Sequence, residues 1–236
     1  MPIPMESLDE SAMQAIGHIR TPFREKFGAP RQAGLAPAAE GVLTLEPPFN
    51  RPEALHGLEA FSHVWLIWRF HLATGDTQDR RPTVRPPRLG GNRRLGVFAT
   101  RSPFRPNGLG LSAVRLLAVE PEACRLTLGG VDLADGAPVY DIKPYVPYAD
   151  GIADAVGGFA DARPEARLAV TFSAAAQAFL RDRIALRRLI EQTLALDPRP
   201  AFHGNPERVY GMRLDDVEVR WRVEDGAARV IRVEPA

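Results

Sequence analysis

Residues 62–70 read Ser-His-Val-Trp-Leu-Ile-Trp-Arg-Phe, which is the clearest strand pattern in the chain. Successive side chains of a β-strand point to opposite faces. One face of this stretch carries only large apolar side chains, Val64, Leu66, Trp68 and Phe70. The other face mixes aromatic and basic groups, His63, Trp65, Ile67, Arg69 and His71. We expect the first face to lie in a core and the second to border a half-open pocket.

Short strands of this kind recur on both sides of residues 62–70. They are predicted at residues 16–19, 41–45, 96–100, 112–120, 125–133, 139–142 and 167–172, with helical turns at 51–58. The 22 prolines also favour short strands and turns over a helical bundle. Since no helices of roughly 10–15 residues alternate with these strands, the pattern predicts an antiparallel barrel or sandwich.

The C-terminal part contains the one convincing helix pattern, over residues 174–196, with Ser173 as its N-cap. Arg183 and Arg187 fall inside the apolar stripe of this helix. They either snorkel or pair with acids, or they point at a ligand.

The tail, residues 217–221 and 228–233, predicts a two-stranded hairpin. We therefore expect a mainly β protein, with a β domain over residues 1–160 and a small α+β domain of one helix and one hairpin over residues 161–236.

The composition is that of an ordinary globular protein, with 45% hydrophobic residues, 25% charged residues and a net charge of +1. The single cysteine, Cys124, can form no internal disulfide or cysteine-based zinc site, and it fits a reducing compartment. No apolar run approaches the roughly 18 residues of a membrane span. We expect a soluble, cytoplasmic protein without a membrane partner.

Residues 80–119 hold nine arginines and no Asp or Glu. They alternate with turn-forming Pro, Gly and Asn, so they form a poor core. Guanidinium groups form bidentate hydrogen bonds with phosphate and carboxylate, and loops hold such groups at a protein surface. The segment is therefore either an anion site or a solvated loop whose charges pair with acids elsewhere.

Residues 108–113 match the dinucleotide fingerprint G-x-G-x-x-A. A turn precedes them and a strand pattern follows, so we reject a Rossmann site.

Two further patterns could mark sites. His63 and His71 share a face of the predicted strand but lie about 26 Å apart on it, which is too far for one metal ion, so no metal site is expected. Asp132, Asp135 and Asp141 surround a strand–turn–strand junction, either as turn residues or as acceptors for a ligand.

Four segments resemble the TsaA-like or TrmO family in order and spacing. They are Ile16-Gly-His-Ile-Arg-Thr-Pro-Phe23 leading into Pro30-Arg-Gln32, Phe61-Ser-His-Val-Trp65, Ala99-Thr-Arg-Ser-Pro-Phe-Arg-Pro-Asn107, and Asp135-Gly-Ala-Pro with Asp141-Ile-Lys-Pro-Tyr145. Residues 197–201 and 209–211 also resemble the extra C-terminal domain of this family.

This resemblance implies an antiparallel β-barrel methyltransferase that uses S-adenosyl-L-methionine and is not of the Rossmann type. It implies a homodimer with the cofactor near the subunit interface, and tRNA carrying N6-threonylcarbamoyladenosine as the substrate, methylated at N6 beside the anticodon. It places the cofactor contacts at Pro30, Arg31, Gln32, His71, Arg101, Leu111, Asp135, Gly136, Ala137 and Pro138. The family usually has Thr where this chain has Ala137, so a hydroxyl contact is absent there.

Beside this resemblance, the residues themselves suggest further roles. Arg31 or Arg101 could bind the cofactor's carboxylate, and the other basic groups could bind tRNA phosphates. Asp141 or Tyr210 is the expected proton acceptor. The expected substrate-binding residues are Arg88, Arg105, Lys143, Tyr145 and Arg199, and Trp65, Tyr145 and Tyr210 are candidate platforms for an unstacked base. The alternatives are a non-catalytic barrel that binds RNA or nucleotides and a methyltransferase for a small molecule.

Overall fold

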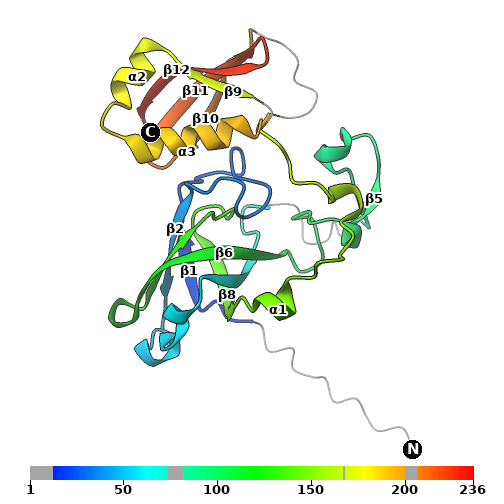
Figure 1. Cartoon of the computed structure of the whole chain (residues 1–236), viewed down its shortest axis with the longest axis vertical. Coiled ribbons are helices and arrows are strands. Elements are labelled where there is room, and N and C mark those ends of the chain that lie inside the picture. The colour runs from blue at the N-terminus through cyan, green and yellow to red at the C-terminus, as the bar shows by residue number, and fades with distance from the viewer. Residues whose placement is uncertain (1–12, 74–81, 167, 200–206) are drawn as a thin grey trace, which may run out of the picture.

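The computed structural model describes residues 13–73, 82–166, 168–199 and 207–236, and it contains a closed barrel and a separate four-stranded sheet (Figure 1). The barrel strands are neighbours in the order β1-β2-β7-β6-β3-β8, and every pair is antiparallel. Their bounds are β1 (Gly17–Arg20), β2 (Glu40–Leu45), β3 (His63–Arg69), β6 (Leu109–Glu120), β7 (Arg125–Gly129) and β8 (Ala137–Pro144). The predicted antiparallel barrel is confirmed.

Strand β3 has the two faces that its alternation predicts. Val64, Leu66 and Trp68 are buried in the barrel, while Arg69 is exposed on the outside. The indole of Trp68 packs over Gly110 of β6, where a Cβ atom would lie 2.3 Å from the ring. Glycine at position 110 is therefore what lets the tryptophan close this part of the barrel.

Residues 109–113 form the start of β6, Gly108 lies in the turn before it, and this segment does not open a helix. The rejection of a dinucleotide-binding fingerprint is thus confirmed.

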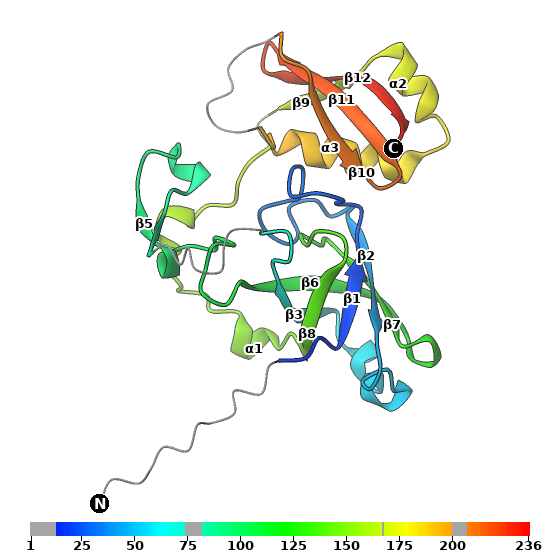
Figure 2. The ribbon, with the colours of Figure 1, turned by 180° about the vertical axis from the view of Figure 1, so that it is seen from behind.

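One predicted strand, residues 96–100, is wrong. The chain there forms β5 (Leu95–Gly96), which pairs with β4 (Thr83–Val84), and then the 3-10 helix η4 (Val97–Ala99). Thr100 donates a hydrogen bond from its Oγ1 to the Val97 carbonyl at 2.8 Å, which closes a helical turn and ends the strand. With η3 (Pro87–Leu89), these elements form an excursion that stands off one side of the barrel (Figures 1 and 2).

The remaining short helices lie between the strands. The helical turns predicted at 51–58 are present as η1 (Pro52–Leu55) and the start of η2 (Leu58–Ala60). The other short helices are η5 (Pro121–Ala123), α1 (Pro147–Asp150) and η6 (Gly158–Ala160).

The C-terminal sheet has the strand order β10-β11-β12-β9, so the expected two-stranded hairpin is only its centre. Its strands are β9 (Ala169–Phe172), β10 (Tyr210–Leu214), β11 (Val217–Glu224) and β12 (Ala227–Pro235). Strand β9 pairs in parallel with β12 across the two helices between them, a pairing that local sequence does not encode.

The single helix expected over 174–196 is also wrong, because the chain forms α2 (Ala174–Phe179) and α3 (Ile184–Ala195). The buried positions explain the break. Ala176 and Leu180 are spaced by four residues, but the next buried positions begin at Leu186, six residues after Leu180, which is out of phase on one helix. A turn between α2 and α3 brings both buried stripes against the same sheet.

The two arginines within that helical pattern are paired with acids. Arg183 Nη2 lies 2.5 Å from Asp216 Oδ1, and Arg187 Nε lies 3.1 Å from Glu191 Oε1. This confirms the first of the two alternatives for them.

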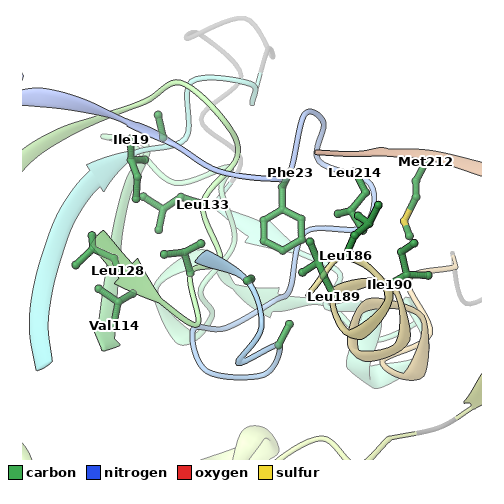
Figure 3. Close-up of a cluster of buried hydrophobic side chains, with 14 of the residues drawn as sticks. Ile19, Phe23, Val114, Leu128, Leu133, Leu186, Leu189, Ile190, Met212 and Leu214 are labelled. Carbon is green, nitrogen blue, oxygen red and sulfur yellow. The ribbon is translucent and has the colours of Figure 1, made fainter. Parts of the chain in front are cut away.

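The barrel and the C-terminal sheet share one hydrophobic core. Figure 3 shows Phe23 between Leu133 of the barrel part and Leu189 and Leu214 of the C-terminal part. Beside it, the ring of Phe27 stacks on Trp221 with centroids 5.7 Å apart. No helix among the described residues is long and apolar enough to cross a membrane.

Candidate functional site

Segments far apart in the sequence meet at one end of the barrel. Arg101 donates a hydrogen bond from Nη1 to Gln32 Oε1, which joins the loop before β6 to the loop before β2. The Gly34 amide donates to the Gly130 carbonyl at 2.7 Å, which brings the end of β7 to the same loop. Two groups of predicted cofactor residues, the Pro30–Gln32 segment and Arg101, are therefore neighbours.

The Asp135 turn is fixed by its own hydrogen bonds. Asp135 Oδ1 accepts from the Thr21 amide at 2.8 Å, and Oδ2 accepts from Arg24 Nη1 at 2.6 Å. Gly136 has φ +75°, which glycine adopts without strain. Because its carboxylate is already bonded, Asp135 holds the turn in shape, and the turn offers mainly backbone to a ligand.

Ala137 follows in this turn and is fully buried, opposite Ile19 of β1. Its side chain faces the core and not a ligand. The replacement of the family's threonine at this position therefore changes core packing, and any contact of Ala137 with a cofactor is through the backbone.

His71 lies against the same turn, since a Cβ atom at Gly136 would be 3.9 Å from His71 Nε2. Burial lowers the pKa of His71 below its usual value, and the nearby His18 and Lys26 lower it further, although a hydrogen bond to the Asp135 backbone opposes this. The imidazole is therefore neutral at pH 7, able to donate from one nitrogen and accept at the other.

A buried polar chain runs beneath this cluster. Trp68 Nε1 donates to Ser112 Oγ at 3.0 Å, and Ser112 Oγ donates to Asp132 Oδ1 at 2.7 Å. Burial raises the pKa of Asp132 to about 6, against the opposing effects of the Ser112 hydrogen bond, a backbone bond to Ala33 and the positive charge of Arg101. Asp132 thus links the barrel wall to the loop that carries Gln32.

Sequence reasoning placed Asp132 at a junction but did not find its partner. The available signal was Ser112, the one polar side chain on a face of β6 otherwise made of Gly110, Val114 and Leu116.

Asp132→Asn should change how stability depends on pH. The folded-state pKa lies about 2 units above the ordinary value of 3.8, so the native state binds more protons between pH 4 and 6, and wild-type stability falls as pH rises through this window. As the pH rises from 4 to 7, the unfolding free energy of the variant relative to that of the wild type should increase by up to about 3 kcal/mol. Urea unfolding at several pH values measures this, and parallel curves would contradict it.

Arginines of the acid-free segment remain without acidic partners. Arg85, Arg93, Arg94, Arg101 and Arg115 are exposed, and none forms an ion pair within the described part of the chain. The pairs that do form involve arginines outside the segment. Of the two alternatives for the segment, the structure favours the anion site.

Of the remaining arginines in this segment, only the side chain of Arg105 is described by the structure. Arg105 is half-buried, and its Nη1 donates to the Thr100 carbonyl at 3.4 Å. The side chain of Arg88 and the whole of Arg80 and Arg81 lie outside what the structure describes.

A row of side chains crosses the outer face of the barrel next to this end. Ile67 of β3 pairs with Leu111 of β6 on one side and Asp141 of β8 on the other. Leu111 is 56% exposed, and Asp141 Oδ2 lies 3.2 Å from Lys143 Nζ. Neighbouring strands are about 4.8 Å apart, so Asp141 lies about 10 Å from Leu111, within reach of one bound ligand.

Tyr145 lies further along the same face. Its ring centroid is 5.7 Å from that of Trp65 and 6.3 Å from that of His63. The three rings form a half-buried aromatic cluster that borders the Asp141 row.

Tyr210 and Arg199 are not brought to this group within one chain. Tyr210 is buried in the C-terminal core, with its ring 5.6 Å from Trp221. Arg199 holds Asp197 through bonds of 2.7 and 2.9 Å, and this pairing raises its pKa. Both side chains support the C-terminal core, which the sequence did not predict.

The fold and this cluster define a closed antiparallel barrel with a basic group of loops at one end and an appended sheet. Family models for the tRNA-methyltransferase O N-terminal domain and the TrmO C-terminal domain match residues 18–151 and 165–236. The chain belongs to the TrmO family.

Individual relatives agree with this membership. The chain is 46% identical over 230 residues to the tRNA (adenine(37)-N6)-methyltransferase of Escherichia coli, covering 94% of this chain and 97% of the relative. It is 55% identical over 216 residues to a putative S-adenosylmethionine-dependent methyltransferase RcsF of Pseudomonas aeruginosa, covering 89% and 91%. The crystal structure of TrmO from Pseudomonas aeruginosa superposes with a TM-score of 0.77 at 47% identity, covering 94% and 97%.

Proposed function

We propose that this protein uses S-adenosyl-L-methionine to methylate N6 of N6-threonylcarbamoyladenosine at position 37 of tRNA. The methyl donor and the tRNA position follow from membership in a family whose similar members are named tRNA (adenine(37)-N6)-methyltransferases. The threonylcarbamoyl group on the target base is the finer part of the proposal. The observation that carries the proposal as a whole is the hydrogen bond that joins Arg101 of the acid-free segment to Gln32, together with the Leu111–Ile67–Asp141 row on the outer face of the barrel.

The barrel-end residues fit the cofactor. A guanidinium with no acidic partner at Arg101 suits a carboxylate, and Gln32 fixes its direction. The exposed Leu111 would offer apolar contact to the cofactor. The backbone of the Asp135 turn could approach the cofactor closely because Gly136 has no side chain. Pro30, Arg31, Gln32, His71, Arg101, Leu111 and the Asp135–Pro138 turn remain the proposed cofactor residues. When bound, the cofactor supplies an electrophilic methyl group on a sulfonium, so the chain must mainly orient it and exclude water.

The remaining cationic groups suit the tRNA backbone. We propose that Arg88, Arg105 and Lys143 contact phosphates, and that Tyr145 contacts the target nucleoside. We also propose that residues 1–160 hold the cofactor and that residues 161–236, with Arg199, assist tRNA binding. The shared core around Phe23 supports this division, because it would hold both surfaces on one rigid body.

The transferred methyl group replaces a proton, and Asp141 is the better supported of the two candidate acceptors. It lies in the Leu111 row, half-exposed, whereas Tyr210 is buried. Asp141→Asn should reduce the single-turnover rate by roughly 10²- to 10⁴-fold if it is a general base, with the donor's Kd unchanged. Tyr210→Phe, which keeps the ring packing, is the comparison. An undiminished single-turnover rate in Asp141→Asn would remove it as the acceptor.

We further propose a homodimer with the cofactor site near the interface, in the cytoplasm, where tRNA is found. The exposed Leu111 beside the Asp141 row supports an interface there. Analytical ultracentrifugation tests the oligomeric state.

Mass spectrometry of tRNA nucleosides from cells with and without the gene tests the activity. The methylated threonylcarbamoyladenosine should disappear without the gene and return when purified protein and labelled donor are added. A non-catalytic RNA-binding barrel would instead show salt-sensitive RNA binding and no labelled nucleoside.

A further inference from the structure

We propose that Phe98 and Phe104 form a stacking site for unpaired RNA bases that neighbour the methylated adenine. This inference rests on the proposed function, because it names how the same site holds its RNA. Phe98 is 78% exposed and Phe104 is 53% exposed, and both lie within the arginine segment.

Neither ring is needed to fold the segment that carries it. Val97, the neighbour of Phe98, is buried and fills the space under η4. Thr100 caps the turn through its bond to the Val97 carbonyl, and the Ser102 Oγ accepts from the Phe104 amide at 3.2 Å. The turn is thus held by Val97, Thr100 and Ser102, and both phenylalanine rings project from it.

Phe98 precedes and Phe104 follows the proposed donor-binding residue, Arg101, in the chain. Each lies three residues from Arg101, so neither Cα atom can be more than about 11 Å from that of Arg101. Arg101 in turn bonds to Gln32 at the barrel end. A base stacked on either ring would therefore lie on the same loop as Arg101.

The surrounding charge identifies RNA as the occupant. Arg93, Arg94 and Arg101 are exposed, form no ion pair with another described residue, and lie within five residues of Phe98 along the chain, which favours a polyanion near this ring. Exposed aromatic faces combined with arginines bind single-stranded nucleic acid, because each base has a π-face and each nucleotide a phosphate. An anticodon loop supplies unpaired bases beside its target.

Variants at position 98 separate stacking from simple apolar contact. Phe98→Ala and Phe98→Leu should weaken binding of an anticodon stem-loop RNA by roughly 5- to 100-fold, whereas Phe98→Trp should bind like the wild type. Met13→Ala is the matched control, since Met13 is 59% exposed and lies outside both the arginine segment and residues 161–236. If Phe98→Leu binds as tightly as the wild type, stacking is wrong.

Salt dependence distinguishes the rings from the charges. Phe98→Ala should lower affinity equally at all salt concentrations, whereas Arg93→Ala with Arg94→Ala should make the dependence of log K on log salt less steep by roughly 1 to 2. An RNA with 2-aminopurine beside the target adenine gives a second readout, because its fluorescence should be quenched by the wild type and recover in Phe98→Ala.

Two further outcomes would overturn the proposal. If Phe98→Ala turns a dimer into monomers, the ring belongs to a protein interface, and if it abolishes donor binding, the ring supports the cofactor site. Failure of the proposed function would give a different result. The wild type would then transfer no labelled methyl group to tRNA, while quenching of 2-aminopurine fluorescence by Phe98 could still be measured.

Discussion

Replacing Arg101 by alanine should weaken binding of S-adenosyl-L-methionine by roughly 10- to 100-fold. The guanidinium is exposed, forms no ion pair with another described residue, and is hydrogen-bonded to Gln32. A hydrogen bond from a charged group contributes about 1.5–3 kcal/mol when its partner is also charged, and each 1.4 kcal/mol is a tenfold change in Kd. Isothermal titration calorimetry with the donor measures the loss.

Two variants control this experiment. Arg101→Lys keeps the charge but loses the planar fork, so most of the loss should remain. Arg125→Ala removes an exposed arginine that is already paired with Glu120 at 3.0 Å, and it should leave the donor's affinity unchanged. Wild-type affinity in Arg101→Ala would exclude this side chain as the carboxylate ligand.

Trp221→Ala should destabilise the protein by about 3–5 kcal/mol. The indole is fully buried, and it lies between Phe27 and Tyr210, with ring centroids 5.7 and 5.6 Å away. The substitution leaves a cavity and removes the contact that joins the C-terminal sheet to the Phe27 loop. Urea unfolding at constant pH gives the change in unfolding free energy.

Trp221→Phe is the matched comparison. It keeps a ring in the stack and removes an indole N–H that has no hydrogen-bond partner among the described residues. Its effect should stay below about 1.5 kcal/mol. Equal losses in both variants would mean that the stack contributes little and that the cost arises elsewhere.

The barrel was predictable from the sequence because its strands are locally encoded. The alternation in β3 assigns each side chain to a face, and the burial of Val64 and Leu66 agrees. The errors occur where longer-range contacts decide the structure. The parallel pairing of β9 with β12 joins residues about 58 positions apart, and the break after α2 depends on the sheet that both helices cover.

The site was only partly predictable for the same reason. The resemblance identified Gln32 and Arg101 separately, but their hydrogen bond spans 69 positions and needs the closed barrel. The hydrogen-bonded chain from Trp68 through Ser112 to Asp132 carries no motif, since these residues lie in two strands and a loop that are far apart in the sequence. The sequence did not predict that Tyr210 is buried, because an aromatic residue in a short motif suits a core as well as a site.

The short segment from Thr21 to Arg24 is hydrogen-bonded to both the barrel part and the C-terminal sheet. Thr21 and Arg24 hold the Asp135 carboxylate, while the Pro22 carbonyl accepts from the Asp215 amide at 2.7 Å and Arg24 Nε donates to the Asp215 carbonyl. A displacement of the β10–β11 turn would therefore also move Thr21 and Arg24, which hold the Asp135 turn of the proposed donor site. If RNA contacts the C-terminal sheet as proposed, thermodynamic linkage requires that the factor by which RNA changes donor affinity equals the factor by which the donor changes RNA affinity.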